Sequence, residues 1–252
     1  MQDILSPNLP KEEVTYVVID GRADNTILKS FSDLKINTIL TQRHPDVYEA
    51  ISYHPDIMMH HIGANRIVVA PNTPETLIDS LENLGMEIIL GATKLKEKYP
   101  ATIPYNVARV GKFAFHSTKY TDPVLRRLLE DEGVLLIDVK QGYTKCLTCI
   151  VDENSIITSD AGICSAAKEV GMDTLLIEQD KAISLKPFDM GFFGGATGLI
   201  AQNTLAVTGN INNMKSYAII KDFLKMRGKE LVFLSNRGAI DLGSILPIKI
   251  GL

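Results

Sequence analysis

The feature that most constrains the fold is a pattern that recurs five times, a helix-like segment followed by a short apolar strand. The strands are predicted at 36–41 (INTILT), 86–90 (MEIIL), 134–139 (VLLIDV), 173–178 (DTLLIE) and 230–234 (ELVFL). Glycine adopts the left-handed conformation that ends a helix without steric cost. It precedes four of the strands, as Gly85, Gly133, Gly171 and Gly228. Self-similarity of this kind predicts a repeat architecture.

A β-hairpin is predicted ahead of four of the helices, because each segment has Gly, Asn or Asp at a central turn. The hairpins span 57–69, 106–115, 145–158 and 198–207. The helices that follow them are predicted at 73–84, 122–132, 160–170 and 212–226. The first copy has a helix near 23–34 but only one strand before it, at 14–20, so it is one strand short.

The repeating unit is therefore ββαβ, and we expect a single α/β domain over residues 1–252 with five units in a ring, a five-bladed propeller. The strand predicted at 240–248 has no helix after it. We expect it to complete the first unit and close the ring, since closure removes open sheet edges. A plain doubly wound sheet with mixed strands is the alternative.

Composition narrows the class of protein. The 252 residues are 45% hydrophobic, which is enough for the core of one large domain. The formal net charge of −4 and the lack of a basic stripe argue against a nucleic-acid partner. No apolar run is long enough to span a membrane, and the first residues do not resemble a signal peptide. Three cysteines are typical of a reducing compartment, so we expect a cytoplasmic protein.

Four polar residues fall at equivalent starts of the units, and the repeat predicts that their side chains converge on the axis of the ring. They are Asn106, Tyr143, Lys145 and Asp241. A pocket with a lysine and carboxylates suits a small zwitterion such as an amino-acid derivative. A close Lys–Asp pair could also transfer protons. The alternative is an internal salt bridge that only neutralises buried charge.

Two further patterns bear on ligands. Gly194 and Gly195 begin the run GGATG, which lacks the nucleotide-binding spacing. This run either lets backbone amides approach an anionic ligand group or allows tight packing. Cys146 and Cys149 have CxxC spacing, but residues three apart on a strand face opposite sides, so neither a metal site nor a cofactor is predicted. Cys146 is interpreted as a buried thiol, with a nucleophile as the alternative.

The arrangement of units and five short segments resemble the pentein superfamily, also called the guanidine-modifying-enzyme fold. The segments are HPDI (54–57), YNV (105–107), QGYTKC (141–146), GGATG (194–198) and DLGSILP (241–247). The chain looks most like an uncharacterised bacterial group within it. The resemblance implies pseudo-fivefold symmetry. In the enzymes it implies a Cys nucleophile on the C-terminal strand, a His in the fourth unit and acids that hold a guanidinium.

The sequence departs from the enzymes at both catalytic positions. Asp241 or Leu242 falls where the Cys is expected, and Tyr143 falls at the His position. No cysteine follows Cys164. The resemblance therefore implies that the chain is not a deiminase or amidinotransferase of the thiol-dependent type.

One element of the enzymes is kept in the tripeptide His54-Pro55-Asp56. Pro55 biases His54 towards an extended backbone. By the resemblance, Asp56 stands where the enzymes carry a guanidinium-holding acid. The alternative is that Asp56 caps a neighbouring backbone amide in a turn.

The preferred hypothesis is that the chain binds a small amino- or guanidino-type molecule in its central pocket, with turnover left open. The pocket is predicted to be lined by His54, Asp56, Asn106, Tyr143, Lys145 and Asp241. If it is an enzyme, the resemblance implies a hydrolase or transferase of an amidine or amino-acid-like substrate. The alternatives are a non-catalytic binding module, for a protein or the ribosome, and a regulatory partner of another protein.

Overall fold

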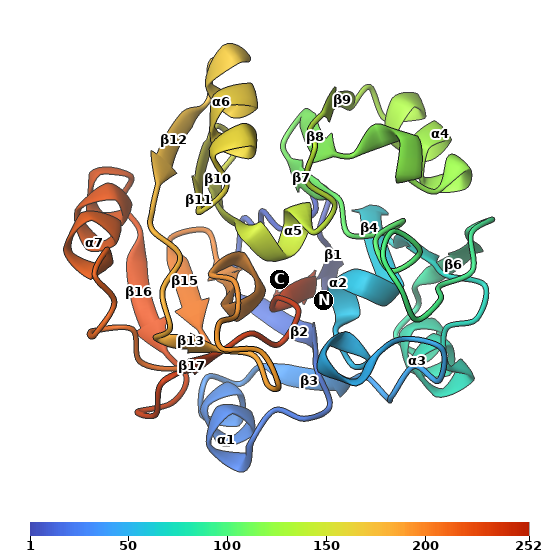
Figure 1. Ribbon diagram of the computed structural model, residues 1–252. Coiled ribbons are helices and arrows are strands. Elements are labelled where there is room, and N and C mark those ends of the chain that lie inside the picture. Colours follow the sequence, from blue (N-terminus) through green and yellow to red (C-terminus); the bar gives the residue numbers. More distant parts are fainter. Residues whose placement is uncertain (252) are drawn as a thin grey trace.

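The structure is a computed structural model that describes residues 1–251. Its small sheets and helices surround a central region, where the N-terminal strand β1 (Gln2–Asp3) pairs with the C-terminal strand β18 (Leu246–Ile250) (Figure 1). No helix in the described part of the chain combines the length and apolar character needed to cross a membrane. The fold is mixed α/β, as the repeat pattern predicts.

Five of the sheets share one arrangement, in which an antiparallel pair is followed by a strand parallel to the second member. The first contains β18, β2 (Val14–Ile19) and β3 (Asn37–Leu40). The next two contain β4 (Met59–Gly63), β5 (Arg66–Val69) and β6 (Glu87–Leu90), and β7 (Ala108–Val110), β8 (Phe113–His116) and β9 (Leu135–Asp138). The last two contain β10 (Thr148–Asp152), β11 (Ser155–Thr158) and β12 (Asp173–Leu176), and β14 (Thr197–Ala201), β15 (Thr204–Val207) and β16 (Glu230–Phe233).

The C-terminal strand β18 lies antiparallel to β2 and so occupies the place that β4, β7, β10 and β14 hold in their own sheets. It joins the first sheet from the far end of the sequence, as the missing strand of the first copy predicts. A sixth, two-stranded sheet pairs β13 (Ile183–Ser184) with β17 (Ala239–Ile240) in parallel.

One helix connects the two parallel strands of each of the five sheets. These are α1 (Asn25–Asp33), α3 (Glu75–Asn83), α4 (Pro123–Asp131), α6 (Ala161–Glu169) and α7 (Tyr217–Met226). Aspartates at 24, 122 and 160 accept backbone N–H bonds at three of the helix starts, which satisfies donors that the helix itself leaves free. Helix α7 begins five residues later than predicted, because 212–216 form turns.

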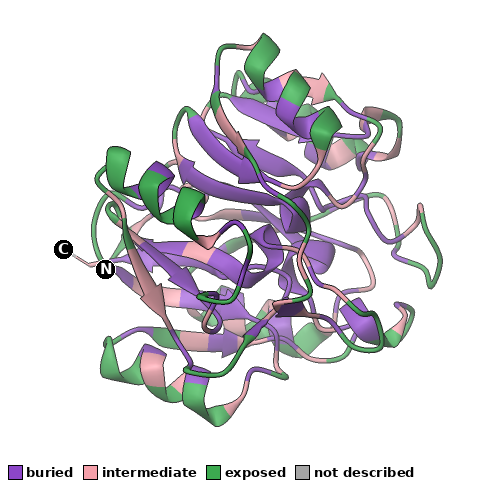
Figure 2. Cartoon of the chain, turned by 60° about the vertical axis from the view of Figure 1, so that its left-hand side comes forward, coloured by how far each residue is buried: buried purple, intermediate pink, exposed green. Residues whose placement is uncertain are grey.

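Each long helix buries one apolar stripe against its sheet and exposes the opposite face (Figure 2). In α1 the stripe is Ile27 and Phe31, and in α4 it is Leu125 and Leu129, all fully buried. The spacing of four residues places each pair on one side of its helix. The inner strands are buried almost throughout, so the core follows the sheets around the centre.

The structure corrects the prediction for three segments that reach the centre. Residues predicted to start two hairpins form single helical turns instead, α2 (Pro55–Met58) and α5 (Thr144–Leu147). A short 3₁₀ turn, η3 (Gly194–Ala196), directly precedes β14, as α2 precedes β4 and α5 precedes β10. The two other 3₁₀ turns, η1 (Glu49–Ile51) and η2 (Thr118–Tyr120), lie in connecting segments.

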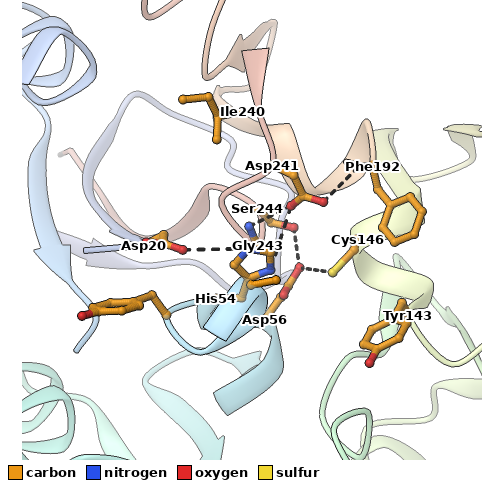
Figure 3. A network of polar contacts seen from close by, with 12 residues as sticks. Asp20, His54, Asp56, Tyr143, Cys146, Phe192, Ile240, Asp241, Gly243 and Ser244 are labelled. Atoms are coloured by element: carbon orange, nitrogen blue, oxygen red, sulfur yellow. Dashed lines mark hydrogen bonds and ion pairs between the residues drawn. The ribbon is translucent and has the colours of Figure 1, made fainter. Parts of the chain in front are cut away.

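The predicted strand 240–248 is broken. Strand β17 ends at Ile240 and β18 begins at Leu246, with Gly243 and Ser244 at φ of 64° and 74° between them. A strand requires negative φ, so these left-handed residues interrupt it. The segment 241–245 thereby turns into the centre of the molecule, where it meets α2 and α5 (Figure 3).

Candidate functional site

The polar centre is built around Asp56, in the first turn of α2 (Figure 3). Its Oδ2 atom accepts hydrogen bonds from Ser244 Oγ at 2.8 Å and from Cys146 Sγ at 3.2 Å. Oδ1 of Asp56 has no partner among residues 1–251. The carboxylate therefore receives side-chain donors, and the predicted alternative, in which it caps a backbone amide, is not what the structure shows. Burial raises the pKa of Asp56, although the Lys145 charge opposes that rise.

Lys145 is also buried and reaches Asp56 through Ser244. Its Nζ donates to Ser244 Oγ at 2.8 Å, and the Ser244 hydroxyl donates in turn to Asp56. Burial lowers the pKa of Lys145, while the charge of Asp56 has the opposite effect. Lysine, serine and carboxylate thus form one chain of hydrogen bonds, in which the two charged groups compensate each other.

Asn106 holds α5 in position. Its Oδ1 accepts from the Lys145 backbone N–H at 2.9 Å, and its Nδ2 donates to Cys146 Sγ at 3.2 Å. Burial raises the pKa of the Cys146 thiol well above its usual value, and the charges of Asp56 and Asp241 add to this rise. Cys146 is therefore a protonated thiol that donates to Asp56, in agreement with its interpretation as a buried thiol.

Asp241 lies at the start of the break between β17 and β18. Its Oδ2 accepts from the Phe192 N–H at 2.9 Å and its Oδ1 from the Gly243 N–H at 3.1 Å. Burial raises the pKa of Asp241 to about 7; the two N–H groups lower it, and the charges of Asp56 and Asp20 raise it further. This carboxyl therefore changes its charge near neutral pH.

The two glycines of the GGATG run pack tightly at this place. A Cβ atom on Gly195 would overlap the Asp241 carboxylate, and one on Gly194 would lie 2.6 Å from the Cys146 carbonyl oxygen. The absence of both side chains is therefore what allows Asp241 and α5 to approach. This is the packing role that the sequence left as one of two alternatives.

His54 lies between two carboxylates. Its Nε2 is 3.8 Å from Asp20 Oδ2 and its Nδ1 is 4.0 Å from Asp241 Oδ1, both too long for hydrogen bonds. Burial, followed by the charge of Arg22, lowers the pKa of His54 to about 3, so the ring is neutral at physiological pH and forms no ion pair. Asp20 itself is paired with Arg22, whose Nη2 is 2.6 Å from Oδ2.

A cavity of about 300 Å³ opens from this centre. His54, Cys146 and Asp241 lie at its polar end. The remaining walls are largely aromatic and aliphatic, from Tyr48, Ile51, Tyr143, Leu185, Phe188, Met190 and Phe192, together with Gln179 and Asp189. Tyr48 packs edge-on against Phe188 at 6.2 Å between ring centroids. The hydroxyls of Tyr143 and Thr102 share a hydrogen bond with 2.7 Å between the oxygens, and the Tyr143 hydroxyl also lies 3.4 Å from that of Tyr48.

The eight residues predicted to bind substrate reach the centre but do not line one cavity. His54, Tyr143 and Asp241 line the large cavity, whereas Asp56 and Lys145 line a second one of about 20 Å³, behind α2 and α5. That space is large enough for only about one water molecule. Asn106 is fully buried and acts on α5, and Gly194 and Gly195 act through packing.

Four residues that lie at the centre are not among the pocket residues that the sequence predicts. They are Asp20, Tyr48, Cys146 and Ser244. Asp20 had a signal, a carboxylate directly after the apolar strand β2 and before Gly21. Ser244 had none, because its role depends on the left-handed break that turns it inward.

The charges of the centre do not balance. Arg22 compensates Asp20, and Lys145 compensates one of Asp56 and Asp241. One buried carboxyl therefore lacks a cation, and burial, the largest cause, raises the pKa of Asp241 to about 7.

The fold is that of the pentein superfamily. The chain superimposes on an inosamine-phosphate amidinotransferase from Streptomyces griseus with a TM-score of 0.61 and 9% identity, over 99% of this chain and 98% of that one. An amidinotransferase of the saxitoxin biosynthetic pathway from Microseira wollei gives 0.56 at 11% identity, over 95% and 96%. Agmatine deiminase of C. jejuni gives 0.54 at 11% identity, over 92% and 91%.

Residues 18–246 match the family described as "Family of unknown function (DUF6873)", and the chain belongs to that family. No curated protein matches the sequence. Identities of 9–11% to the solved structures establish the common fold and leave the chemistry of this centre to its own residues.

Proposed function

We propose that the protein binds a small cationic amine or guanidine in the 300 Å³ cavity. The observation that carries this proposal is Asp241, a buried carboxyl without a compensating cation at the inner end of a largely apolar cavity. A ligand ammonium or guanidinium there would supply the missing charge. The similar solved structures include amidinotransferases and an agmatine deiminase, which is consistent with this class of ligand.

The walls favour a ligand with an apolar body behind its cationic group. Tyr48, Tyr143 and Phe188 present aromatic surfaces, which attract cations and pack against methylene groups. The volume is at the small end of the range for ligand pockets, so it suits a molecule of amino-acid size. An open cavity with polar groups at its end favours a small-molecule site over the binding-module alternative.

We propose that the protein binds this amine or guanidine without a reaction that uses a cysteine thiolate as nucleophile. A nucleophilic cysteine acts as a thiolate. Burial and two neighbouring carboxylates oppose ionisation of Cys146, and its thiol donates a hydrogen bond to Asp56.

We also propose that the five similar sheets form a five-bladed pseudo-fivefold ring closed by β18, which would keep this cavity on the axis.

The direct test is thermal unfolding with arginine, agmatine, citrulline and simple alkylamines, for the wild type and Asp241→Asn. A ligand at 100 times its Kd stabilises the native state by roughly 2.7 kcal/mol. We expect stabilisation by at least one cationic compound and its loss in Asp241→Asn. The matched control is Glu178→Gln, which removes a carboxylate whose side chain is 72% exposed. Absence of a shift with every cation, or an equal shift in Asp241→Asn, would contradict the proposal.

The affinity for a cation should depend on pH, because only the ionised form of Asp241 attracts it. Since the pKa of Asp241 is raised to about 7, its carboxyl is mostly protonated at pH 5 and ionised at pH 8. We expect calorimetry to give an affinity roughly 100-fold higher at pH 8 than at pH 5. The titratable groups that face Asp241 are His54, Asp56, Asp20, Cys146 and Lys145. A pH-independent affinity would show that Asp241 is not the binding carboxyl.

A further inference from the structure

We propose that His54, Asp56 and Cys146 form a binding site for one divalent transition-metal ion, with Zn²⁺ as the ion that their chemistry suits best. One ligand atom from each residue lies within 4.8 Å of the other two, and all three side chains are buried. Imidazole nitrogen, carboxylate oxygen and thiolate sulfur are the three ligand types that Zn²⁺ accepts. The ion would supply the same positive charge as the amine proposed above, so the two would compete for the centre, and binding of the metal alone tests this site separately.

Unused ligand atoms mark the site. Asp56 Oδ1 and both ring nitrogens of His54 lack hydrogen-bond partners within residues 1–251, although all of them are buried. Buried polar atoms without partners are rare, because each costs free energy that a partner would restore. A metal ion would satisfy Asp56 Oδ1 and one nitrogen of His54 together.

The distances fit with small side-chain movements. Zinc bonds of about 2.0–2.3 Å place neighbouring tetrahedral ligands about 3.4–3.6 Å apart. Cys146 Sγ is already 3.2 Å from Oδ2 of the Asp56 carboxylate, and the unpartnered Oδ1 is bonded to the same carbon atom. All three ligand atoms lie within 4.8 Å of one another, so the most distant pair must approach by at most about 1.4 Å to reach tetrahedral spacing. Rotation of the His54 ring or the Asp56 carboxylate can supply this movement.

The surroundings of His54 match those of a zinc ligand. Histidine that binds zinc usually donates its second ring N–H to a carboxylate, a backbone carbonyl or a water molecule. In Figure 3, Asp20 lies on one side of the His54 ring, while Asp56 and Cys146 lie on the other. Asp20 Oδ2 is 3.8 Å from Nε2, so a slight shift of the ring would form this outer hydrogen bond. Nδ1 would then be the nitrogen that binds the ion.

Charge and access also agree with a metal ion. Binding replaces the Cys146 thiol proton, which leaves for solvent, so a dication adds one net positive charge. That is the charge that the buried centre lacks. His54 and Cys146 both line the large cavity, which gives the ion a path from solvent.

The test is titration of metal-free full-length protein with Zn²⁺ by calorimetry, and with Co²⁺ by absorption spectroscopy. We expect one ion per chain and a thiolate-to-cobalt charge-transfer band. Cys146→Ser should lose the band and weaken Zn²⁺ binding by at least about tenfold. Cys149→Ser is the matched control, because Cys149 is an equally buried thiol three residues away. It should keep both signals.

Two results would overturn the site. One is equal Zn²⁺ affinity in Cys146→Ser and the wild type, and the other is a wild-type protein that gives no charge-transfer band with Co²⁺. Circular dichroism establishes whether Cys146→Ser is folded. If it is not, the wild-type Co²⁺ spectrum decides alone, because the band reports thiolate ligation directly and Cys149→Ser shows which thiol is not responsible.

Discussion

Gly243→Ala is expected to destabilise the protein by more than about 4 kcal/mol, a loss that only a few kinds of substitution produce. Gly243 has φ of 64°, where a residue with a Cβ atom costs about 1–2 kcal/mol. In addition, the new Cβ would lie 2.7 Å from His54 Cα and closer still to the His54 side chain. The carbonyl of Gly243 also accepts the Asp56 N–H at 3.4 Å, so α2 cannot move away without losing that contact.

Gly228→Ala separates the steric effect from the conformational one. Gly228 has the same φ of 64°, but a Cβ atom added there would meet no other atom within 4 Å, since this glycine follows the end of α7 at the surface. It should lose only about 1–2 kcal/mol. Urea unfolding of both variants gives the comparison. Equal losses would show that the packing of 241–245 against His54 does not hold the centre together.

Lys145→Met is expected to destabilise the native state by about 3–5 kcal/mol at pH 8. Lys145 is 6% exposed and is the cation that Ser244 links to the buried carboxylate of Asp56. Its removal leaves Asp56, as well as Asp241, without a compensating cation. The matched control is Lys249→Met, another buried lysine, whose partner Asp3 is more than a third exposed and can be hydrated. This control should lose only about 1 kcal/mol or less.

The loss in Lys145→Met should become smaller as the pH falls. Folding raises the pKa of Asp56, and that of Asp241 to about 7, so the native state holds more protons than the unfolded state. In the unfolded state the pKa of an aspartate is near 4. The stabilisation that comes from a raised native pKa is therefore complete below pH 4 and, for Asp241, is lost as the pH rises through about 7. At pH 5 the Asp241 carboxyl is mostly neutral and needs less compensation.

A second substitution tests the assignment of the partner. Lys145→Met combined with Asp56→Asn removes one charge of each sign and should restore part of the stability lost at pH 8. Urea unfolding of the four proteins of this double-mutant cycle gives the coupling energy, which for contacting charged groups lies at about 0.5–3 kcal/mol. Simple additivity of the two substitutions would mean that Lys145 and Asp56 do not interact through Ser244.

Short-range features of the sequence are sufficient to predict the helices and parallel strands of the five repeats. Apolar runs, glycines such as Gly133 and capping aspartates such as Asp122 predict the helices and parallel strands to within a few residues, except for the start of α7, because these effects act over one or two helical turns. The same signals predict that the strand near the C-terminus joins the first unit. They also point to Asp56, Lys145 and Asp241 as polar residues near the centre, from their positions in the repeat.

Only the tertiary structure decided how those residues are used. The hydrogen bond between Ser244 and Asp56 joins residues 188 positions apart, and it exists because Gly243 and Ser244 break a predicted strand. The helical turns α2 and α5, for which the apolar pattern predicts strand, place His54 and Cys146 beside Asp56. Local preferences act over a few residues, whereas burial, charge compensation and cavity shape depend on elements that meet only after folding.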